Sequence, residues 1–131
     1  NAQAPAASDG TIDLSNERFS IHYTRNVVST DFGGEPCLLV YYDYTNNGSG
    51  ASSAMVDVNL TAYQNGASLE AAIPANSDSA IDAFMKEIQP GETVNVCQAF
   101  SLKDMSPVTL QAVDAFGLDT SVTAVQTLNL Q

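Results

Sequence analysis

The sequence predicts an all-β fold, an antiparallel β-sandwich of about seven strands. Three observations carry this prediction. Short segments alternate apolar and polar residues, turn residues separate these segments at near-regular intervals, and strands do not alternate with helices as they do around parallel sheets. The 131 residues are the usual length of one domain, and Leu, Ile, Val and Phe make up 31 of them, which is above the roughly 20% below which disorder is expected.

The first two strands are predicted between residues 19 and 46. From Phe19 to Arg25 every second side chain belongs to one buried face, and residues 26–30 can extend this strand. Residues 31–36 contain two glycines and a proline, which predicts a turn. Residues 37–46 are β-branched and aromatic, and placing Asp43 on the wet side directs three side chains inward: Val40, Tyr42 and Tyr44.

A hairpin and a short helix are predicted after the loop at 47–53. Residues 55–63 alternate cleanly, with Val56, Val58, Leu60 and Ala62 on one face. Asn65-Gly66 suits a type I′ turn, and residues 67–73 then return as the partner strand. Near 79–88 the apolar residues change to helical spacing, with Ser79 as the expected cap.

Three further strands are predicted over residues 93–102, 108–116 and 122–130. The chain starts with a small, polar, proline-containing segment, and residues 1–17 are expected to form a flexible linker before a sandwich domain at 18–131. Such a spacer commonly follows an export signal or a lipid-attachment segment, which predicts an exported protein.

The charge balance excludes two classes of partner. Fifteen acidic residues oppose four basic ones, for a net charge of −11. Nucleic-acid binding needs clustered Lys and Arg, and anionic headgroups would repel this chain. No apolar run reaches the 18 to 20 residues that span a bilayer, so membrane association is expected only through a lipid anchor outside this sequence.

The two cysteines, Cys37 and Cys97, each lie in an apolar extended segment. An even count in an exported chain favours one disulfide between them, with two buried free thiols as the main alternative. On the predicted strand phases both point away from the main apolar face, so a bridge between neighbouring strands fits better than one across the core. Spacing for a zinc site is absent, and a cysteine nucleophile with His22 as its base is improbable.

Candidate binding residues are Leu39 and Tyr41, which the predicted phase places together on the outer face of their strand. An exposed tyrosine suits recognition of sugars or proteins, while the alternative is that both lie beneath the segment 74–89. No catalytic residues are assigned, because His22 has no nucleophile-elbow motif to serve. No metal or cofactor is expected, although acidic loops such as Ser77-Asp78-Ser79 with Asp82 leave a calcium-stabilised spacer as an alternative.

Four segments together resemble a known family: Phe19-Ser-Ile-His-Tyr23, Leu39 to Asn47, Ala62-Tyr-Gln-Asn-Gly66 and Ile88-Gln-Pro-Gly-Glu-Thr-Val94. Their order is similar to the immunoglobulin-like domain of unknown function found on surface lipoproteins of Gram-positive bacteria. The resemblance implies an immunoglobulin-like sandwich displayed outside the cell. We therefore expect a non-enzymatic module for binding, adhesion or assembly, with a protein or a cell-wall glycan as its partner. A small secreted hydrolase or hydrolase inhibitor is the alternative of another class.

Overall fold

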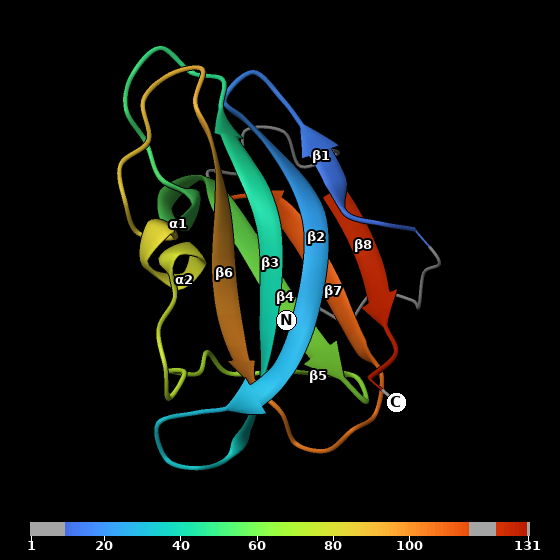
Figure 1. Cartoon of the computed structure of the whole chain (residues 1–131). Coiled ribbons are helices and arrows are strands. Elements are labelled where there is room, and N and C mark those ends of the chain that lie inside the picture. Colours follow the sequence, from blue (N-terminus) through green and yellow to red (C-terminus); the bar gives the residue numbers. More distant parts are fainter. Residues whose placement is uncertain (1–9, 116–122, 131) are drawn as a thin grey trace.

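The computed structural model describes residues 10–115 and 123–130, and it confirms the predicted all-β sandwich. Its eight strands in these residues form two antiparallel sheets of four strands each (Figure 1). The first sheet has the order β1 (Asp13–Ser15), β2 (Phe19–Thr30), β3 (Pro36–Asn46) and β6 (Thr93–Ser101). The second has the order β5 (Ala67–Ser68), β4 (Val58–Gln64), β7 (Val108–Asp114) and β8 (Thr123–Leu128).

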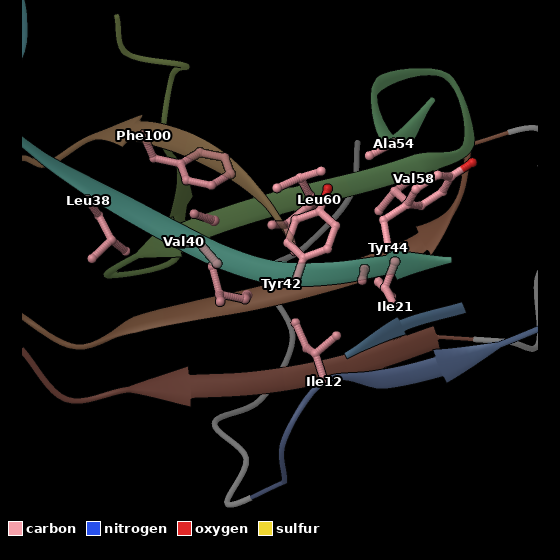
Figure 2. Close-up of a cluster of buried hydrophobic side chains, with 14 of the residues drawn as sticks. Ile12, Ile21, Leu38, Val40, Tyr42, Tyr44, Ala54, Val58, Leu60 and Phe100 are labelled. Atoms are coloured by element: carbon pink, nitrogen blue, oxygen red, sulfur yellow. The ribbon is translucent and has the colours of Figure 1, made fainter. Parts of the chain in front are cut away.

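The core lies between the two sheets and is built from the inward side chains of both. The predicted inward residues of β3 are all part of it, together with Ile21 of β2 (Figure 2). Phe19 of β2 belongs to the same core. Tyr44 and Phe19 are fully buried and lie with their ring centroids 6.5 Å apart. The second sheet contributes Leu60, Leu110 and neighbouring apolar residues to the same core.

Strand β3 is buried on both faces. Val40 and Tyr42 face the core, while Leu39 and Tyr41 belong to a separate apolar cluster on the outer face of the first sheet. A strand that is covered on both sides has no wet face, which explains the continuous run from Cys37 to Tyr42. The outer cover is a short helix, α2 (Ser79–Ala83), with the segment that precedes it.

A β-bulge in β2 changes the face of its second half. Tyr23 lies opposite Tyr42, but Arg25 lies opposite Tyr41, so Thr24 is an extra residue on this strand. The alternation predicted Arg25 on the same face as Tyr23, and this prediction is wrong. The inserted residue turns Arg25 to the outer face, where its side chain is exposed.

The N-terminal boundary also differs from the expectation. Residues 13–15, which were expected to be part of a linker, form strand β1 and pair with β2. Ile12 and Leu14 are buried in the core, and the Ile12 amide donates to Gln126 Oε1 at the edge of the second sheet. The sandwich therefore begins earlier than residue 18, while residues 1–9 lie outside the described part.

Two predicted strands are shorter in the structure. The strand expected from residue 55 starts at Val58, because Ser53 caps a helical turn, α1 (Ala54–Asp57), that leaves Val56 exposed. The Asn65-Gly66 turn is confirmed by positive φ values at both residues, but its returning strand ends at residue 68. The chain then crosses to the first sheet, where Ala71 forms a bridge with Phe100.

The predicted helix near 79–88 exists as a shorter element. It covers residues 79–83, and Asp78 rather than Ser79 is its N-cap. The strands predicted at 93–102 and 108–116 match β6 and β7 closely. The last predicted strand corresponds to β8, and its expected start at residue 122 lies outside the described residues.

Candidate functional site

The two cysteines and the two candidate binding residues lie in one place, the outer face of the first sheet. Cys37, Leu39 and Tyr41 project from β3, and Cys97 projects from the neighbouring strand β6. We call the buried group on this face the outer cluster; its residues are Cys37, Leu39, Tyr41, Ala80, Cys97 and Ala99. The side-chain phase predicted for Leu39 and Tyr41 is correct, but the two are only 7% and 3% exposed, so they lie beneath the covering segment.

Helix α2 is held over the outer cluster by the tyrosine. The Tyr41 hydroxyl donates to Asp78 Oδ2 at 2.6 Å, and the other carboxylate oxygen of Asp78 accepts from the Ile81 amide at 2.8 Å. Asp78 therefore caps the helix and fixes it to the sheet at once. The guanidinium carbon of Arg25 lies 3.8 Å from the centroid of the Tyr41 ring, a cation–π contact on the same face.

These contacts shift the pKa values of the groups in the cluster. Burial and the hydrogen bond to Asp78 raise the pKa of Tyr41 to about 12. Burial alone would raise the pKa of Asp78, but the hydrogen bonds from Tyr41 and from the Ile81 amide hold it below its ordinary value. At neutral pH the pair is therefore a neutral phenol donating to a carboxylate.

The predicted disulfide is absent, and this prediction is wrong. Both cysteines are buried free thiols. They do lie on neighbouring strands, but Cys37 is opposite Ser101 and Cys97 is opposite Tyr41. Four residues along a strand span roughly 13 Å, whereas a disulfide needs Cα atoms within about 7 Å. The register of β3 and β6 therefore keeps the thiols apart.

A small apolar pocket opens beside the outer cluster, between α2, strand β6 and the segment 71–74. Its volume is about 190 Å³. Three of its lining residues are alanines, and their short side chains leave the space that forms the pocket. The full lining is Ala71, Ala72, Pro74, Ile81, Phe84, Met85, Cys97, Gln98 and Ala99.

The Cys97 thiol, which lines this pocket, is protonated and therefore a poor nucleophile. Burial is the main reason that the pKa of Cys97 rises to about 12, and the negative charge of Asp78 adds to it. Burial also raises the pKa of Cys37. Because only a thiolate is a good nucleophile, the pocket offers an apolar surface rather than a reactive group.

A second cluster, which was not predicted from the sequence, joins the two sheets beside α1. The guanidinium of Arg18 binds Asp57 Oδ1 at 2.9 Å and also pairs with Asp114. The Tyr44 hydroxyl donates to the second oxygen of Asp57. Both carboxylates have side chains that are only 3% exposed, so the single positive charge compensates two buried negative ones.

The sequence contains a partial signal for this second cluster. Asp57 and Asp114 each lie at one end of an alternating apolar segment, where a carboxylate can become buried. A buried carboxylate needs a cation, and the sequence has only four Lys and Arg residues to supply one. A shallow depression of about 340 Å³ lies beside Arg18 under the loop 46–52. The charge of Arg18 is already engaged by the two aspartates.

Other candidate groups lie apart from both clusters. His22 is an exposed residue of β2, with Nδ1 at 3.9 Å from Asp13 Oδ1. Within the described ranges no three His, Cys, Asp or Glu side chains gather closely enough to hold a metal ion. The same residues include no helix with the length and apolar character needed to cross a membrane.

Comparison with protein families gives one match that covers most of the chain. The model of a domain of unknown function, DUF5067, matches residues 1–114. The search of curated proteins found no match.

Three solved structures share this fold at low sequence identity. Two are named "putative lipoprotein". The one from Staphylococcus aureus has a TM-score of 0.72 and 8% identity, and the match covers 95% of this chain and 92% of that one. The one from Bacillus subtilis has a TM-score of 0.69 and 11% identity over 93% of this chain, which spans 39% of the Bacillus protein. A protein from Enterococcus faecalis has a TM-score of 0.68 and 20% identity, with 95% of both chains covered.

Proposed function

We propose that this chain, which belongs to the DUF5067 family of domains of unknown function, is a non-enzymatic binding module displayed outside a bacterial cell. The names of the Staphylococcus and Bacillus structures support the location, since lipoproteins are attached to the outer side of a membrane. The sequence resemblance described above supports it independently. We also propose that the sandwich is immunoglobulin-like. In support, β3 pairs with β6 in one sheet and β4 pairs with β7 in the other, the crossed pairing of Greek-key sandwiches.

The observation that carries the binding function is the apolar pocket beside α2. Its volume of about 190 Å³ is below the roughly 300 Å³ of small pockets for drug-sized ligands. A hollow of this size accommodates one apolar side chain. Met85 borders it and is 63% exposed, so apolar surface continues outside the pocket. The pocket is therefore proposed to receive a single large apolar side chain of a partner polypeptide.

The chemistry of the lining favours binding over catalysis. Cys97 is protonated at neutral pH, and Gln98 is the other polar side chain of the lining. An amide can orient a ligand by hydrogen bonds but does not transfer protons at neutral pH. A cell-wall glycan, the other partner class expected from the sequence, would find few polar groups here.

The test is a titration followed by amide chemical shifts. The probes are N-acetyl-phenylalanine amide, N-acetyl-leucine amide and a soluble cell-wall glycan fragment. We expect the two apolar probes to shift the amides of Ala71 and Cys97, and the glycan to leave them unchanged. Ala71→Phe fills the pocket from its exposed rim and should abolish the shifts, while Ala67→Phe, an exposed alanine of β5, should preserve them. Shifts that survive in the filled variant would refute the site.

The proposed location needs its own experiment. The full-length protein, tagged and expressed in its native cell, should be degraded by a protease added to intact cells. A cytoplasmic marker protein in the same cells should stay intact. If the protein is cleaved only after the cells are lysed, the proposal of display outside the cell is wrong.

A further inference from the structure

Two large apolar side chains stand almost fully in solvent at one end of the sandwich. Phe32 is 83% exposed and Ile73 is 73% exposed, the two highest values among the large hydrophobic residues that the structure describes. Phe32 belongs to the turn between β2 and β3, and Ile73 belongs to the crossing segment between β5 and α2. We call this pair the apolar tip; the β2–β3 turn that carries Phe32 lies at the lower end in Figure 1.

The backbone joins the two segments directly. The Phe32 amide donates to the Ile73 carbonyl at 2.7 Å, and the Ala75 amide donates to the Thr30 carbonyl at 3.0 Å. A β-bridge between Asp31 and Pro74 lies between these two bonds. The two side chains are therefore held next to each other by segments that are 41 residues apart in sequence (Phe32 to Ile73).

The turn itself is also fixed. Asp31 Oδ1 accepts from the amides of Gly33 and Glu35, both at 2.9 Å, and the Gly34 amide donates to the Asp31 carbonyl at 3.0 Å. Gly34 has a φ of +86°, which reverses the chain at low cost only because it is glycine. Little backbone freedom is left to lose, so a partner that binds the tip meets a small ordering cost.

Exposed aromatic residues on an ordered backbone are typical of the residues that dominate protein interfaces. Their surroundings here are acidic. The carboxylates of Asp31 and Glu35 lie in the same turn, Glu70 lies in the crossing segment, and the adjoining loop carries Lys103 and Asp104. Four carboxylates thus accompany one ammonium group at this end of the molecule.

We propose that the apolar tip docks a segment of a partner protein that carries a large apolar side chain next to Lys or Arg. Charge complementarity selects this occupant. An anionic membrane is repelled by the carboxylates, and a second copy of this chain brings the same negative charge of −11. This surface adjoins the pocket beside α2, because Pro74 both lines the pocket and forms the bridge with Asp31, but the proposal does not depend on that pocket having a ligand.

The experiment is a selection from a phage-displayed library of random twelve-residue peptides, followed by affinity measurements on synthetic copies of the selected peptides. We expect the selected sequences to pair an aromatic or large aliphatic residue with at least two basic residues. Phe32→Ser and Ile73→Ser should each weaken binding at least tenfold. Met55→Ser, at an apolar residue of α1 that is 49% exposed, should change the affinity less than twofold.

Three further readouts decide between explanations. Glu35→Gln should weaken binding and reduce its dependence on salt, because a screened charge contact has been removed. Met85→Ser, on the α2 side of the pocket, should leave peptide binding unchanged, which separates this surface from the pocket. Failure to select any binder, selection of peptides without basic residues, or equal binding by Phe32→Ser would each overturn the proposal. Concentration-dependent dimerisation that Phe32→Ser abolishes would overturn it in favour of self-association.

Discussion

Replacement of Arg18 by Met is the sharpest test of the physical account of this fold. Arg18 is the counterion of Asp57 and Asp114, whose side chains are each 3% exposed. Methionine keeps much of the length of the side chain but removes the charge. The variant then holds two carboxylates in one poorly solvated place with no cation between them.

Breaking a buried ion pair by removal of one partner costs about 3–5 kcal/mol of stability. For a domain of this size each kcal/mol lowers the midpoint of thermal unfolding by about 4 °C. Arg18→Met should therefore lower the midpoint by roughly 12–20 °C. The fold should persist, because the apolar core between the sheets is untouched.

The decisive observation is a change of sign in a double-mutant cycle. Asp114→Asn destabilises the natural protein, because it weakens the pair with Arg18. The same change in the Arg18→Met background relieves repulsion between two buried carboxylates, so there it stabilises the protein. Chemical denaturation at pH 7 measures all four corners of the cycle.

Matched controls use charges that lie at the surface. Arg25→Met removes an exposed cation whose contact with Tyr41 is worth about 0.5–1 kcal/mol, and Asp13→Asn removes a carboxylate that is 74% exposed. Neither control should approach the effect of Arg18→Met. The reasoning is refuted if Arg18→Met costs less than Arg25→Met, or if Asp114→Asn is equally destabilising in both backgrounds.

Three further predictions follow from the structure. Asp78→Ala should lower the free energy of unfolding by about 1 kcal/mol at pH 7 through loss of the helix cap. In the folded protein, hydrogen bonds outweigh burial and lower the pKa of Asp78. The stabilisation by Asp78 is therefore present above about pH 4 and is lost as the pH falls through the lowered pKa of the folded state. Denaturation at about pH 2.5 should therefore show a smaller difference from the natural protein, and an undiminished difference contradicts the assignment. Cys37 and Cys97 should react with a thiol reagent only after denaturation, since burial raises the pKa of both thiols. Treatment with a reductant should leave the mass of the intact protein unchanged, whereas a gain of two hydrogen masses would reveal a disulfide. Gly66→Ala should cost about 1–2 kcal/mol because it forces an alanine to a positive φ, +85° in the structure, whereas Gly50→Ala, at ordinary φ with open space around it, should be nearly neutral in the same thermal melt.

The alternation of apolar and polar residues predicted side-chain orientation correctly where the whole segment forms one regular strand. The inward positions of β3 and the Asn65-Gly66 turn were both predictable, because period-two patterning and turn chemistry act over a few residues. The same pattern failed at Val56, where Ser53 caps a helical turn inside an otherwise alternating segment. The Ser53 side chain accepts a hydrogen bond from the Val56 amide, which favours a helical turn over a strand at this point. The alternation of apolar and polar residues does not reveal this hydrogen bond.

Long-range relations were the other source of error. The outward phase of Leu39 and Tyr41 was correct, but their cover comes from Asp78 and α2, about 40 residues later in the chain. The pairing of Cys37 and Cys97 depended on the register between β3 and β6, which no local pattern contains. The cluster around Arg18 likewise assembles residues from four distant segments, so composition could indicate only that buried carboxylates need a cation.

The bulge at Thr24 has a consequence for how this domain can vary. If β2 kept all of its residues but paired without the bulge, Arg25 would lie opposite Val40 and point into the core, and Val27 would leave the outer cluster. Deletion of Thr24 itself would remove the bulge and leave residues 25–30 on their present faces, and many side chains are acceptable at position 24 because the site is exposed. Among natural or engineered variants, this strand should therefore accept both substitution and deletion at position 24 more readily than the loss of a residue from its regularly paired part.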